Sequence, residues 1–106
     1  MRILQIAPLW ETVPPPAYGG TEAVVSLLTE ELVAMGHDVT LAAAGDSCTS
    51  ARLVSTLDRS LRRADDLKDR TPHDWRHLGA AMALAGEHNI VHNHAGELAM
   101  VMSSLI

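Results

Sequence analysis

The sequence predicts an α/β domain of three layers, in which a mostly parallel sheet of about four strands lies between helices. Two short segments, residues 2–7 and 38–44, are almost continuously apolar, as strands covered on both faces are. Segments with helical spacing follow the first strand and precede the last one. Strands that alternate with helices form parallel sheets with right-handed crossover connections.

The first strand, residues 2–7, leads into a proline-rich segment, 8–18, which is too polar and kinked for regular structure. A helix is expected to begin near Thr21, because apolar residues then recur at helical spacing. Gly36 is well placed to end it. The spacing predicts one buried stripe, made of Val24, Leu27, Leu28, Leu32 and Met35.

Residues 38–44 predict the second strand, and the polar segment 45–50 separates it from a third strand at 52–57. Nine of the thirteen residues in 58–70 are charged, so this segment predicts a short surface helix or a solvated loop.

A second long helix is expected from Thr71, because Thr71-Pro72-His73-Asp74 resembles a capping box with proline at the first helical position. Its apolar positions are Trp75, Leu78, Met82 and Ala85. The helix should end near Gly86 or His88, before a fourth strand at 89–93. Gly96 or Glu97 opens a last helix.

Length and composition limit the function. The 106 residues predict one small domain, 1–106, and the net charge of −5 argues against nucleic acid or an anionic membrane as a partner. A single cysteine, Cys48, excludes an internal disulfide and suits the cytoplasm. The apolar run 3–9 is too short for a membrane span, contains Gln5 and lacks a signal-peptide cleavage site. Because an apolar pattern at 98–106 stops abruptly, we expect the chain to be the front piece of a longer protein.

The Gly19-Gly20 step is the first candidate site. Glycines between a strand and a helix can bring bare backbone close to a ligand, and the N–H groups of the following turn, including Thr21, can bind an anion. The alternative is a tight turn without a ligand. The G-x-G-x-x-G and Walker patterns are absent, which makes a nicotinamide-dependent oxidoreductase improbable.

His94 is the second candidate, because it ends a strand and precedes Ala95-Gly96. A neutral imidazole there can donate to a ligand hydroxyl or to a developing anion, or it can simply be satisfied by backbone. His92 alternates with His94 and should share its face. No cysteine or carboxylate completes a tetrahedral set with the histidines, so we expect no metal site.

Three residues near the glycines are candidates for contact with a second substrate. Trp10 and Tyr18 can form a wall for it, although Tyr18 can equally pack on the prolines. Glu22 can bind a hydroxyl, although first-turn carboxylates are also common for helix-dipole reasons alone. Cys48 lies in a small polar loop without a nearby histidine and is expected to be a bystander.

Four spaced motifs resemble the start of a retaining glycosyltransferase of family 4, which has the GT-B architecture of two Rossmann-like domains. They are MRILQIAP at 1–8, VPPxxYGGTE at 13–22, LVxxGHDVTL at 32–41 and IVHNH at 90–94. The proline-rich variant is similar to a bacterial subgroup labelled UDP-glucose:tetrahydrobiopterin glucosyltransferases. The resemblance implies a Rossmann-like N-terminal domain whose C-terminal, donor-binding partner domain, with its Glu-x7-Glu motif, has no counterpart in this chain.

The resemblance also implies roles for individual residues. Gly19, Gly20 and Thr21 would approach the donor diphosphate, and His94 would lie beside the donor sugar. Trp10, Tyr18 and Glu22 would then face the acceptor.

The implied reaction transfers a hexose, glucose for the similar subgroup, from a nucleotide diphosphate sugar such as UDP-glucose to an acceptor hydroxyl with retention, without metal or cofactor. The isolated chain is expected to be inactive, and it can form an artificial homodimer through apolar surface that the missing domain would cover. The alternative is a non-catalytic module of Rossmann-like fold that binds a nucleotide or phosphate at Gly19-Gly20.

Overall fold

The computed structural model describes residues 1–63 and 71–96, which form an α/β domain around one parallel sheet. The strands lie in the order β3-β2-β1-β4, and every pairing is parallel. Their bounds are Arg2–Ile6 for β1, Asp38–Ala42 for β2, Arg52–Val54 for β3 and Ile90–Asn93 for β4. The predicted fold class is confirmed, and each predicted strand is present with shorter bounds, most of all β3, which ends at Val54 and not at Leu57.

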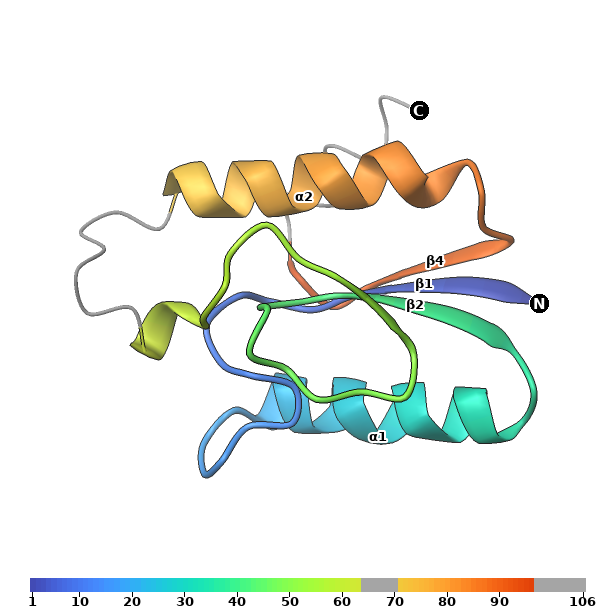
Figure 1. The fold of residues 1–106 in the computed structure, drawn as a ribbon, viewed down its shortest axis with the longest axis horizontal. Helices are drawn as coiled ribbons and strands as arrows, with labels where there is room; N and C mark the ends of the chain where they lie inside the picture. Colours follow the sequence, from blue (N-terminus) through green and yellow to red (C-terminus); the bar gives the residue numbers. More distant parts are fainter. Residues whose placement is uncertain (64–70, 97–106) are drawn as a thin grey trace.

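Two long helices cover opposite faces of the sheet (Figure 1). Helix α1, Gly20–Ala34, lies on one face and helix α2, Thr71–Ala85, on the other. A short 3-10 helix, η1, spans Leu61–Arg63 within the charged segment. The rest of that segment, 64–70, and the predicted last helix after Gly96 lie outside the described residues.

Because side chains alternate along a strand, β1 contributes to a separate core on each face. On the α2 face, Leu4 and Ile6 belong to a buried cluster with Ala42, Leu78, Ala81 and Met82. On the α1 face, Ala7, the residue that follows β1, belongs to a cluster with Val13, Val25, Leu41 and Ala43. The predicted core positions Leu78, Met82 and Ala85 of the second helix are buried, whereas Trp75 is exposed.

The predicted stripe of the first helix is wrong at three of its five positions, whereas Leu28 and Leu32 are partly buried. Val24, Leu27 and Met35 are 57%, 75% and 66% exposed, and the helix instead buries Val25 and Thr29 against the sheet. The helix has apolar residues on several sides, so spacing alone did not identify its inner face. The buried face of the helix includes Thr29, whose hydroxyl accepts a hydrogen bond from the buried amide of Gln5.

Loops at the carboxyl ends of the strands are tied together by backbone hydrogen bonds. The amide of Cys48 donates to the carbonyl of Val13 at 2.9 Å, and the amide of Leu61 donates to the carbonyl of Leu9 at 2.8 Å. The first loop is thereby attached to the β2–β3 loop and to the segment that begins η1. Among the described residues, no helix is long and apolar enough to cross a membrane.

Candidate functional site

The Gly19-Gly20 step and His94 come to the same edge of the sheet. Helix α1 begins at Gly20, near the carboxyl end of β1, and β4 ends at Asn93 beside the same strand. The backbone amide of His94 donates to the carbonyl of Ile6, the last residue of β1, at 2.9 Å. In parallel α/β sheets, ligands bind at this carboxyl edge.

The two glycines differ in what they require. Gly19 has a φ of 129°, which disfavours any residue with a Cβ, and a Cβ there would lie 3.1 Å from the Pro15 Cβ. Gly20 would meet nothing within 4 Å. Gly19 is therefore needed for the turn, whereas Gly20 leaves open space beside the backbone. Helix α1 has no side-chain cap, which leaves its first-turn N–H groups available to another acceptor.

Two buried carboxylates border Gly19. A Cβ on Gly19 would lie 3.2 Å from the Glu11 Cγ and 3.2 Å from the Glu22 Oε1. The side chain of Glu11 forms an ion pair with Arg62 of η1. Glu22 is only 5% exposed and lies in the first turn of α1, where the helix dipole stabilises its negative charge.

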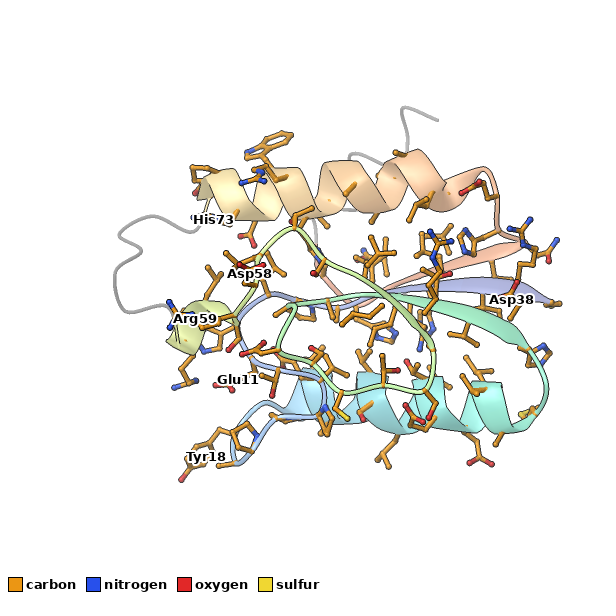
Figure 2. All side chains as sticks on the ribbon, in the orientation of Figure 1. Glu11, Tyr18, Asp38, Asp58, Arg59 and His73 are labelled. Carbon is orange, nitrogen blue, oxygen red and sulfur yellow. The ribbon has the colours of Figure 1, made fainter. Side chains whose placement is uncertain are left out.

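The two aromatic candidates, Trp10 and Tyr18, have different surroundings. The guanidinium of Arg62 lies over the Trp10 ring, 5.1 Å from its centroid, so Trp10 belongs to the same group as Glu11. Tyr18 is 82% exposed and points away from the domain at the tip of the proline loop (Figure 2). Thr21 is also exposed, beside the open space at Gly20.

His94 is held by side chains from the strand and helix beside it. Its Nε2 lies 3.2 Å from the Oε1 of Gln5, whose Nε2 donates to the Thr29 hydroxyl at 3.2 Å. The rings of His92 and His94 are 4.0 Å apart, which confirms that they share a face. Burial, and secondarily the nearby His92, lowers the pKa of His94 from its ordinary value. His94 is therefore neutral at physiological pH.

Two other histidines, His77 and His88, have ring nitrogens in contact with backbone carbonyls. His77 on α2 is buried, with its Nε2 2.6 Å from the carbonyl oxygen of Ala7. His88 contacts the Leu84 carbonyl and the Thr40 hydroxyl. Within residues 1–63 and 71–96, no three His, Cys, Asp or Glu side chains form a group that could hold a metal ion. Cys48 is exposed.

Sequence reasoning missed three residues of this region, namely Gln5, Glu11 and Arg62. For Gln5 a signal was present, because an amide inside an otherwise apolar strand must find partners. Glu11 and Arg62 are 51 positions apart, and no local pattern links them.

No family model matches the chain, and no curated protein matches it significantly.

Proposed function

We propose that this chain is the acceptor-side domain of a retaining glycosyltransferase that moves a hexose from a nucleotide diphosphate sugar to an acceptor hydroxyl. The observation that carries the proposal is the meeting of Gly19-Gly20 and His94 at the carboxyl edge of a parallel sheet. The four sequence motifs support it, because two of them supply these two elements. UDP-glucose is the donor that the similar subgroup favours.

In this proposal the first turn of α1 binds the donor diphosphate. The N–H groups at Gly20 and Thr21 have no side-chain cap and donate to phosphate oxygens, with the helix dipole adding to the attraction. The open space beside Gly20 admits the phosphate close to the backbone. The neighbouring Glu22 limits this attraction, so most of the binding energy comes from basic residues of a second, donor-binding domain.

His94 lies beside the donor sugar in this proposal. Its lowered pKa keeps the imidazole neutral, which suits a hydrogen bond to a sugar hydroxyl and makes a cationic role at the departing phosphate unfavourable. The acceptor lies on the side of Glu22 and Trp10, where the Glu22 carboxylate accepts a hydrogen bond from an acceptor hydroxyl. The exposed Tyr18 reaches the acceptor only if the acceptor extends along the proline loop.

The reaction needs neither metal nor cofactor. The bond between the anomeric carbon and the donor phosphate oxygen breaks, and a bond from that carbon to the acceptor oxygen forms on the same face. The acceptor proton passes to the departing phosphate, and N–H groups and cations stabilise the charge that develops there. No protein base is required in this scheme.

The test is sugar transfer from labelled UDP-glucose by the protein that includes its donor-binding domain, compared with the 1–106 chain alone. Transfer with retention by the longer protein and none by the chain is the expected result. A longer protein that transfers no sugar from any nucleotide donor would contradict the proposal. The Gly20→Ala variant should weaken UDP binding about five-fold, whereas Gly79→Ala, another glycine with free space around it, should leave binding unchanged.

A non-catalytic nucleotide-binding module is the second candidate. It is favoured by one observation, namely that the uncapped first turn of α1 is formed by this chain alone. Titration of the chain with UDP separates the two. Micromolar affinity favours the module, whereas weak or absent binding favours the half-enzyme.

A further inference from the structure

Gln5 is a fully buried amide in the central strand of the sheet. Its neighbours Leu4 and Ile6 face α2, so its own side chain faces α1. Burying an amide is costly unless both of its ends are hydrogen-bonded. Both ends are bonded here, the nitrogen to Thr29 and the oxygen to His94, each at 3.2 Å. The amide thus connects helix α1 to the residue that follows β4.

The directions of these bonds determine the form of the His94 ring. With the Gln5 amide oriented so that its nitrogen faces Thr29, its Oε1 faces His94 and can only accept, and this orientation assigns the proton to the His94 Nε2. In a neutral ring the other nitrogen, Nδ1, is then an acceptor. With the residues that the structure describes, Nδ1 forms no hydrogen bond, and His94 is only partly buried.

We propose that Gln5, itself anchored by Thr29, is a positioning residue that holds His94 in the Nε2–H form and leaves Nδ1 as the acceptor for a ligand hydroxyl. The identity of that ligand, a sugar, rests on the proposed function, whereas the form of the ring does not. This acceptor role differs from both roles considered from the sequence, in which the imidazole donates a hydrogen bond to a ligand hydroxyl or to a developing anion. The His94 Nδ1 accepts a hydrogen bond from a ligand hydroxyl, and the ring does not donate one to a developing anion.

The first experiment is nitrogen-15 NMR of the histidine-labelled chain at pH 8, where the ring is neutral. His94 should show the Nε2–H form with a proton protected from exchange with water. Gln5→Met, similar in size but without an amide, should remove that protection. The control is Thr40→Val, which removes the hydroxyl partner of His88 from the neighbouring strand and should leave the His94 signals unchanged. A wild-type Nδ1–H ring, or protection that survives Gln5→Met, would overturn the proposal.

Two further variants keep the test decisive if Gln5→Met does not fold. Gln5→Glu retains an acceptor and should preserve the protected proton, whereas Thr29→Val removes the anchor of the amide and should reduce the protection. Protection lost in Gln5→Glu, or unchanged in Thr29→Val, would count against positioning by Gln5.

Kinetics distinguishes this proposal from the proposed function. In the protein with its donor domain, Gln5→Met should lower kcat about ten-fold with little change in KM, and Gln5→Glu should recover part of the loss. No transfer by the wild type, together with the expected NMR result, would reject the transferase and keep the positioning role. Transfer that is unaffected by Gln5→Met would reject positioning in catalysis.

Discussion

Two histidines at the carboxyl edge of the sheet have lowered pKa values for the same main reason, burial, yet they occupy different environments. His77, on the α2 side, is almost fully buried, and its ring contacts the Ala7 carbonyl. His94, beyond β4, contacts the Gln5 amide and remains partly exposed. A perturbed pKa therefore does not by itself identify a functional histidine. The hydrogen-bond partner of the ring and its exposure to solvent distinguish His77, which is structural, from His94, the candidate site residue.

The largest expected effect tests the structural side of this comparison. His77→Ala removes a buried ring and leaves the Ala7 carbonyl without that contact, so the free energy of unfolding should fall by about 3 kcal/mol. Urea denaturation monitored by circular dichroism measures it. The turnover of the remaining folded protein should stay near the wild-type value. A change below about 1 kcal/mol would show that His77 contributes little to packing.

The variant His94→Ala tests the functional role proposed for the second histidine. In the proposed transferase, turnover should fall about 100-fold, because the proposed role of His94 is an oriented hydrogen bond at the reacting sugar. The free energy of unfolding should change by about 1 kcal/mol or less, since the residue is partly exposed. Steady-state kinetics beside a denaturation curve separates the two effects. Unchanged turnover would remove His94 from the site and make it structural, like His77.

The two glycines at the start of α1 also differ, because Gly19 is needed for the turn and Gly20 is proposed to approach a ligand. Gly19→Ala should destabilise the fold by about 2 kcal/mol, because its φ is 129° and Pro15, Glu11 and Glu22 crowd the added Cβ. Gly20→Ala should not destabilise the fold, because its Cβ meets nothing. Thermal unfolding of both variants measures the difference. Equal destabilisation would mean that both glycines serve only the turn.

The pH dependence of stability compares the two histidines directly. The lowered pKa values mean that the unfolded chain takes up protons near pH 6.5 while the folded chain does not. The free energy of unfolding should therefore fall as pH decreases below about 6.5, by at most about 1.4 kcal/mol per pH unit for each histidine. His77→Gln should flatten this dependence more than His94→Gln, because His77 is more deeply buried. The reverse order, measured by urea denaturation at pH 7.5 and 5.5, would contradict the assignment of roles.

The smallest effect concerns the acidic neighbour of the proposed phosphate site. Glu22→Gln removes a negative charge from the first turn of α1, so UDP should bind about five-fold more tightly, a gain of about 1 kcal/mol. Isothermal titration of the protein with its donor domain measures the affinity. The KM for the acceptor should rise in the same variant. Unchanged UDP affinity would place the diphosphate away from α1.

The sequence was sufficient for the fold because apolar segments such as residues 2–7 and 38–44 indicate buried parallel strands directly. It also brought Gly19-Gly20 and His94 to one edge, since parallel strands share a carboxyl edge. The sequence pattern failed for the inner face of α1, because that helix has apolar residues on several sides, and its buried face includes Thr29, the hydrogen-bond partner of Gln5. The link between Glu11 and Arg62 depends on tertiary contacts alone.

The central position of β1 affects the order in which the molecule can assemble. Its neighbours are β2, which begins at Asp38, and β4, which begins at Ile90, so one edge of β1 stays unpaired until Ile90 and the residues after it have left the ribosome. Gly20 and His94 are 74 positions apart in the chain. Contacts of such high sequence separation form slowly, because a long loop must close first. The candidate site is therefore expected to be completed late in folding, after the β1–β2 pair and α1 have already formed.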